Sequence, residues 1–193
     1  DQTEQICFYS NIWLTFFSAL FLLSSVLIAF SKIEVKLLAA PAYADAWQYI
    51  PLLCAATLFC AFTAYLGSVY TVKKKSNLSF WTSLIGAGSN IVMNALLIPS
   101  KLGAFGAALA TFVSYFIVFL LRAKSARRFI PFELFTRKLL LNLSILSIQI
   151  LFITFGWTGW QFVQAGAILS LIFINGKQVL KVFYVLRKNT GGI

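Results

Sequence analysis

Positive charge alternates along this chain in step with its apolar runs, and this pattern constrains the fold more than any other feature. Six apolar runs separate seven connecting or terminal segments. Thirteen of the sixteen Lys and Arg residues fall in the first, third, fifth and seventh segments together, and only three fall in the others. Because loops rich in Lys and Arg stay on the cytoplasmic side, we expect a multi-pass protein of the inner (cytoplasmic) membrane, with both ends of this chain in the cytoplasm.

The composition also favours lipid as the surroundings of most side chains. The chain is 60% apolar and 11% charged, with a mean hydropathy of +0.87, whereas soluble domains are about 25% charged. The net charge of +11 lies in short segments beside apolar runs, which is typical of contact with anionic lipid headgroups. We therefore expect membrane lipids, and no nucleic acid, as partners.

The lengths of the apolar runs predict an all-α integral membrane fold, since a spanning helix needs about 20 mostly apolar residues. The expected spans are about 6–30, 49–72, 78–98, 103–121, 139–155 and 160–175. Trp13 is expected at the inner interface, and the glycines of Gly156-Trp157-Thr158-Gly159 predict a tight turn. The segment 122–138 is long enough for a short interfacial helix. The basic cytoplasmic tail, 176–193, has an amphipathic stripe formed by Val179, Val182, Phe183 and Leu186.

The sequence offers little for catalysis or metal binding. It contains no histidine, its five acids lie outside the expected spans, and its three cysteines lack the spacing of metal ligands. We expect no catalytic residue, metal or cofactor, and a transporter rather than an enzyme. A membrane-embedded glycan polymerase or glycosyltransferase is the less favoured alternative, because it needs an acid or a histidine at its reaction centre and the outer segments offer only Glu34 and Asp45.

Small residues at a four-residue spacing predict close helix packing in the fourth span. Two such rows adjoin, and small residues let membrane helices approach closely. The rows are Gly103, Ala107 and Thr111, and Gly106, Ala110 and Ser114. The expected packing positions are Gly86, Gly103, Gly106, Ala107 and Ala110.

Polar side chains inside the spans are candidates for a substrate cavity. Asn90 and Asn94 lie one turn apart on the third span, and amides are costly toward lipid. Hydrogen bonds between helices are the favoured interpretation, and a polar pathway is the alternative. The full set of cavity candidates is Tyr9, Ser18, Ser25, Thr57, Thr63, Tyr65, Asn90 and Asn94.

Basic residues of two cytoplasmic segments are expected to meet at the cytoplasmic mouth. Setting topology and contacting lipid is their favoured role, and attracting a phosphate headgroup is the alternative. These residues are Lys73, Lys74, Lys75, Arg122, Arg127 and Arg128. We expect no charged residue inside any span.

Several stretches resemble a known family. They are Tyr43-Ala-Asp-Ala-Trp-Gln-Tyr-Ile-Pro-Leu-Leu53, Ile85-Gly86, Asn90-Ile-Val-Met-Asn94, Leu97-Ile98-Pro99 and Gly103-Ala-Phe-Gly-Ala-Ala-Leu-Ala-Thr111. Together they resemble polysaccharide-export flippases, of the O-antigen and capsule type, in the multidrug/oligosaccharidyl-lipid/polysaccharide (MOP) exporter superfamily. The matching stretches cover about 43–121.

The resemblance implies a MATE-like transporter of two six-helix lobes that rock between inward-open and outward-open states. The whole chain, 1–193, would be the C-terminal lobe, and its first two helices would line the cavity. The implied substrate is a polyprenyl-pyrophosphate-linked oligosaccharide. Because the chain begins at Asp1 and its only methionine is Met93, we expect an N-terminal lobe earlier in the same polypeptide, with a basic residue in at least one span. The alternatives are a drug or metabolite antiporter of the same superfamily, a lipid II-type flippase and a non-transporting assembly subunit.

Overall fold

The computed structural model describes the backbone of residues 2–190 and the side chains of residues 2–181. Within this part the chain is helical, and each of the six α-helices is long and apolar enough to cross a membrane. This confirms the expected all-α, multi-pass membrane architecture. The helices are α1 (Gln2–Leu38), the 3-10 helix η1 (Pro41–Gln48), α2 (Ile50–Val72), α3 (Ser76–Leu97), α4 (Gly103–Ala126), α5 (Thr136–Thr154) and α6 (Trp160–Thr190).

Three helices run further than their apolar runs. α1 has 37 residues, about 55 Å at 1.5 Å per residue, so it is longer than the bilayer core of about 30 Å. α4 continues to Ala126, and the residues that follow form turns and irregular backbone up to Phe135. The interfacial helix expected in 122–138 is therefore wrong. α6 continues into the basic tail, but Val182, Phe183 and Leu186 of the predicted stripe lie outside the described side chains.

The chain divides into two compact units, which are described separately. Unit 1 comprises residues 1–29 and 133–193, and unit 2 comprises residues 30–132. Unit 1 thus contains most of α1 together with α5 and α6. Unit 2 contains the last turns of α1 followed by η1, α2, α3 and α4.

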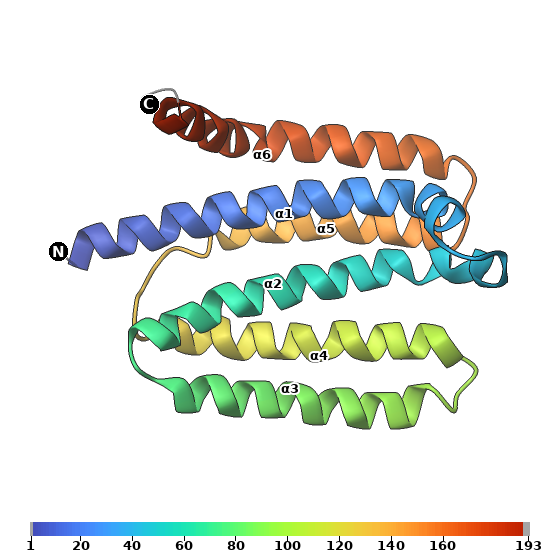
Figure 1. Ribbon diagram of the computed structural model, residues 1–193, viewed down its shortest axis with the longest axis horizontal. Helices are drawn as coiled ribbons and strands as arrows, with labels where there is room; N and C mark the ends of the chain where they lie inside the picture. Colours follow the sequence, from blue (N-terminus) through green and yellow to red (C-terminus); the bar gives the residue numbers. More distant parts are fainter. Residues whose placement is uncertain (1, 191–193) are drawn as a thin grey trace. The chain divides into compact units, whose positions relative to one another are not determined.

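In unit 2, α4 packs against both α2 and α3, and Figure 1 shows it between them. Phe59 of α2 is the centre of an aromatic cluster with rings of α4. Its ring centroid lies 5.1 Å from that of Phe116, 5.2 Å from that of Phe119 and 5.6 Å from that of Phe112. These edge-on and tilted contacts are the geometry that aromatic pairs favour, and they fix α4 against α2.

Two of the predicted glycines lie where α3 and α4 approach closely. A Cβ on Gly86 would lie 2.4 Å from a methyl group of Val118, and one on Gly106 would lie 2.7 Å from the Leu97 carbonyl oxygen. Gly103 has a different role, because a Cβ there would have no neighbour within 4 Å and its φ is +46°. Its expected packing role is therefore wrong, and it instead provides a left-handed backbone conformation where α4 begins. Ala110 is fully buried and Ala107 is partly exposed.

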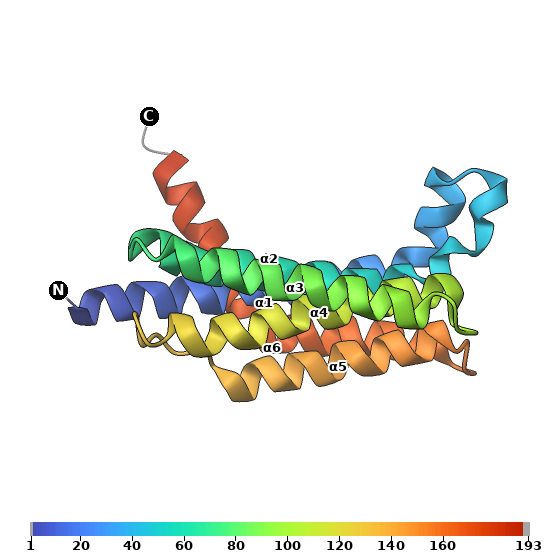
Figure 2. The ribbon, with the colours of Figure 1, turned by 90° about the horizontal axis from the view of Figure 1, so that it is seen from below.

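In unit 1, α5 and α6 pack together and are joined by the predicted two-glycine turn, with φ of +62° at Gly156 and +79° at Gly159. Figure 2 shows this pair from another side, with α6 changing direction in its last part. Trp13 of α1 is fully buried, and its indole N–H donates to the Leu134 carbonyl oxygen at 3.1 Å. Its expected position at the inner membrane interface stays a prediction. The indole N–H is satisfied by this backbone acceptor, as buried tryptophans usually require.

Candidate binding pocket in unit 2

A pocket of about 390 Å³ lies among α2, α3 and α4. This volume is within the range of small-molecule sites in proteins. The lining combines hydroxyl, amide and guanidinium groups with small apolar residues. It comprises Thr63 of α2, Ser83, Gly86, Ala87 and Asn90 of α3, and Thr111, Ser114, Tyr115, Val118 and Arg122 of α4.

Arg122 is the charged residue of this pocket. We expected it in a cytoplasmic segment, but it lies inside α4 and is only 7% exposed. The expectation that no charged residue lies inside a span is therefore wrong. Alanine, lysine and arginine are good helix formers, so α4 does not end where its apolar run ends, and Arg122 turns its side chain toward the neighbouring helices.

The guanidinium group donates to two helices. Nε donates to the Thr82 hydroxyl at 3.0 Å, and one terminal nitrogen, Nη1, donates to the Thr63 carbonyl oxygen at 2.8 Å. The other, Nη2, donates to the Ser83 hydroxyl at 2.9 Å and to the Ser79 carbonyl oxygen at 3.2 Å. Arg122 therefore joins α4 to α2 and α3 through a hydrogen-bond network.

Two neighbours on α2 accommodate the guanidinium without neutralising it. A Cβ on Gly67 would lie 2.8 Å from Nη1 of Arg122, so glycine leaves the space that the group occupies. The Tyr70 ring lies 6.0 Å from the guanidinium carbon, which is the distance of a weak cation–π contact.

The charge of Arg122 is not balanced by a carboxylate. Its acceptors are hydroxyl and carbonyl oxygens, and no acid in the described part of the chain forms an ion pair with it. The acids of unit 2, Glu34 and Asp45, belong to the last turns of α1 and to η1. A buried charge without a partner of opposite sign is costly, which makes this an unusual position for an arginine.

The two predicted amides have different partners. The Asn90 side-chain N–H₂ donates to the Ser114 hydroxyl of α4 at 3.3 Å, and the Asn94 N–H₂ donates to Oδ1 of Asn90 at 2.9 Å. Asn90 thus forms a hydrogen bond between helices and also lines the pocket. Asn94 bonds within α3 and is not among the pocket residues.

Of the eight cavity candidates, Thr63 and Asn90 line this pocket. Thr57 is exposed and donates to the Cys54 carbonyl oxygen, and Tyr65 packs its ring against Phe132.

The remaining candidates belong to unit 1. Tyr9 packs beside Phe8, the Ser18 hydroxyl accepts from the Lys138 ammonium at 3.4 Å, and the Ser25 hydroxyl donates to Oε1 of Gln149 at 2.9 Å.

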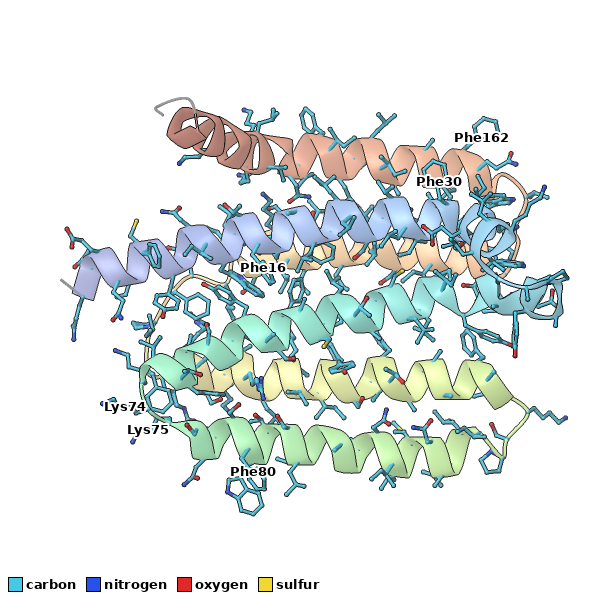
Figure 3. The ribbon with its side chains drawn as sticks, viewed as in Figure 1. Phe16, Phe30, Lys74, Lys75, Phe80 and Phe162 are labelled. Carbon is cyan, nitrogen blue, oxygen red and sulfur yellow. The ribbon has the colours of Figure 1, made fainter. Side chains whose placement is uncertain are left out.

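The other basic residues lie at one end of unit 2, and Figure 3 labels Lys74 and Lys75 there. A hydrogen bond between the hydroxyls of Tyr70 and Ser125 brings the end of α2 beside the end of α4. Lys73–Lys75 and Arg127–Arg128 therefore share this end, as the sequence predicts. Four of these five side chains are exposed, and that of Lys73 is half-buried. Arg122 alone of the six predicted residues is buried.

Sequence reasoning did not name four of the lining residues, Ser83, Ala87, Tyr115 and Val118, and it assigned Thr111 and Ser114 only to close helix packing. A signal for Ser83 exists in the sequence. Ser79, Ser83, Gly86 and Asn90 are three or four residues apart, so they form one face of α3 and extend the row of Asn90 and Asn94 toward the start of the helix.

Unit 1 contains buried amides that the sequence analysis also missed. Asn142 of α5 and Asn175 of α6 exchange side-chain hydrogen bonds at 3.1 Å in both directions. Gln149 donates to the Ser25 carbonyl oxygen at 2.8 Å, and Gln164 donates to the Gln149 carbonyl oxygen at 3.0 Å. These amides join the helices of unit 1 by mutual hydrogen bonds, as polar residues do in membrane bundles.

Comparison with known proteins gives a coarse placement. No family model and no solved structure matches the chain. An uncharacterized membrane protein of Methanocaldococcus jannaschii is 27% identical over 138 residues, which are 72% of this chain and 26% of that protein. The chain thus spans about a quarter of the relative's length. This similarity and the six apolar helices together identify the chain as a multi-pass integral membrane protein.

Proposed function

We propose that the chain is a six-helix lobe of a flippase, a transporter and not an enzyme. Its substrate is a polyprenyl-pyrophosphate-linked oligosaccharide, which it moves across the cytoplasmic membrane for surface polysaccharide synthesis. The observation that carries the proposal is the pocket of about 390 Å³, which places hydroxyl, amide and guanidinium groups inside apolar helices. The resemblance of 43–121 to polysaccharide-export flippases supplies the substrate class.

The physical need for such a pocket follows from the substrate. A sugar hydroxyl that loses its water without a new partner costs several kcal/mol in hydrocarbon. Side chains such as Asn90, Thr111 and Ser83 offer the hydrogen bonds that water would otherwise make. A protein with two access states replaces the barrier of the hydrocarbon by a conformational step.

The proposal includes a second six-helix lobe in the same polypeptide. The Methanocaldococcus relative is almost four times as long as its matched region, so its length leaves space for such a lobe. The two lobes together would enclose the full path of the sugar, while the polyprenyl tail stays in the lipid.

Proton-coupled antiport is less well supported. Arg122 is a buried ionisable residue of unit 2, but an arginine keeps its proton in proteins. It can bind an anion, but it cannot release and recover a proton during a transport cycle.

Deletion of the gene tests the proposal in cells that make a surface polysaccharide. We expect loss of surface glycan and accumulation of the lipid-linked unit on the cytoplasmic side, with both defects reversed by the full-length gene. Normal surface glycan in the deletion strain would reject the proposed function.

A pair of Asn→Leu variants tests whether the pocket matters. Asn90→Leu removes an amide that lines the pocket, whereas Asn11→Leu changes an exposed position of α1. In the complemented strain we expect Asn90→Leu to reduce surface glycan at equal protein abundance, and Asn11→Leu to restore it fully. Full export by Asn90→Leu would remove this pocket from the transport path.

A further inference from the structure

We propose that the pocket of unit 2 is a phosphate-binding site, with Arg122 as the group that binds the oxyanion. The inference deepens the proposed function, on which it rests for the source of a lipid-borne phosphate. The site is built from residues that line one pocket, and its oxyanion is carried either by a lipid headgroup or by free phosphate. A lipid phosphate and a free phosphate present the same kind of group, a phosphorus atom with negatively charged oxygens.

Unbalanced charge is the first argument. Arg122 is 7% exposed and is surrounded by neutral acceptors. Neutral hydrogen bonds stabilise a guanidinium, but they leave its full positive charge in a medium of low dielectric constant, where attraction to an anion is strong. An anion in the adjoining pocket would supply the opposite charge that the described residues do not.

Spare donors are the second argument. An arginine has five N–H donors, and those of Nε and Nη2 are used by Thr82, Ser83 and Ser79. One hydrogen of Nη1 is used by Thr63, and the other has no acceptor among the described residues. The Ser83 hydroxyl accepts from Arg122 and keeps its own hydrogen to donate.

The length of the pocket favours phosphate over a single-atom anion. Ser83 and Asn90 both line it and are seven residues apart on α3, about 10 Å along the helix axis. A chloride ion would contact only one of these groups. A phosphate at Arg122 and Ser83 presents several oxygens and matches the guanidinium in geometry. Asn90 is then available to bind the chemical group that is attached to the phosphate.

Binding to the purified full-length protein in phosphatidylcholine nanodiscs tests the inference. The probes are inorganic phosphate, followed by titration calorimetry, and phosphatidic acid added to the nanodisc, followed by the thermal unfolding midpoint. Binding of inorganic phosphate identifies a free anion as a ligand. A higher midpoint with phosphatidic acid alone identifies a lipid headgroup.

Two substitutions of arginine by glutamine assign the binding to this site. Arg122→Gln removes the buried charge and should weaken binding at least about tenfold, whereas Arg137→Gln removes an exposed charge of α5 and should leave it unchanged. Absence of binding in both arms would overturn the inference, and so would equal binding by wild type and Arg122→Gln.

A third variant keeps the test decisive if Arg122→Gln does not fold. Ala87 lines the pocket, and its methyl group takes no part in the hydrogen bonds of Arg122. Ala87→Leu therefore narrows the pocket and leaves the Arg122 network intact. We expect it also to bind the ligand at least about tenfold more weakly, and unchanged affinity would count against the site. If phosphate binds but the deletion strain has normal surface glycan, the flippase proposal is rejected and the phosphate site stands.

Discussion

At the scale of single residues, Gly106 decides how closely the α3–α4 hairpin packs. An added Cβ would lie 2.7 Å from the carbonyl oxygen of Leu97 and 2.9 Å from its carbonyl carbon. These are backbone atoms, so relief requires a shift of a helix and not only of a side chain. Gly88 of α3 has no atom within 4 Å of its Cβ position, so it serves as a matched control.

Gly106→Ala should lower the free energy of unfolding by about 1–3 kcal/mol, the usual cost of forcing extra volume into a packed interface. Titration with sodium dodecyl sulfate, followed by circular dichroism, measures this change. Gly88→Ala should be neutral or slightly stabilising, because alanine favours a helix more than glycine does. Equal stability of the two variants would contradict the close approach at Gly106.

The sequence predicted the packing roles of Gly86 and Gly106 because small residues at a four-residue spacing indicate a close approach. It could not separate Gly103 from them, since a left-handed backbone at the start of a helix leaves no signal in that spacing. Arg122 was placed outside the membrane because its charge ends the apolar run. Its acceptors belong to Thr63, Ser79, Ser83 and Thr82, about 40 to 60 residues away in the chain, so only the packed helices show where its side chain lies.

At the scale of elements, a pair of amides holds α5 against α6. Asn142 and Asn175 are both fully buried and exchange two hydrogen bonds. Removing one member leaves the other amide buried without its partner, which is costly. Replacing both with leucine removes the demand for a partner while keeping a similar volume.

Asn142→Leu and Asn175→Leu should each destabilise the protein by about 1–2 kcal/mol, toward the upper end of hydrogen bonds between membrane helices. The double variant should be more stable than the sum of the single losses predicts. Detergent unfolding of the wild type, the two single variants and the double variant measures this coupling. As a control, Ser147→Leu changes an exposed position of α5 and should cost little. Additive losses in the double variant would show that the two amides act independently.

The sequence predicted that the helices exist, but it did not predict where all of them end or which polar contacts they make. Each apolar run contains about the number of residues that a membrane helix needs. Helix ends depend on neighbours, as at α4, where the continued helix brings Arg122 to its acceptors on α2 and α3. Single amides such as Gln149 leave a span's mean hydropathy high, so hydropathy alone did not reveal them.

At the scale of the whole molecule, the pocket is a product of three helices and could be predicted only in part. Asn90 and Thr63 were identified as cavity candidates because they are polar residues in apolar runs. Their meeting with Arg122 and Ser83 in one pocket depends on how α2, α3 and α4 pack, which the order of residues along the chain does not specify. The proposed substrate class comes from the resemblance, whereas the polar chemistry of the site comes from the structure.

The claim on which these proposals depend is that the six helices cross the bilayer with the basic segments inside. In the full-length protein, with every native cysteine, including Cys7, Cys54 and Cys60, changed to alanine, single cysteines at Lys74 and Thr158 report the two faces, because both positions are exposed. A membrane-impermeant maleimide should label Thr158→Cys in intact spheroplasts and Lys74→Cys only in inverted vesicles. Labelling of both positions from the same side, or of Thr158→Cys only in inverted vesicles, would contradict the account.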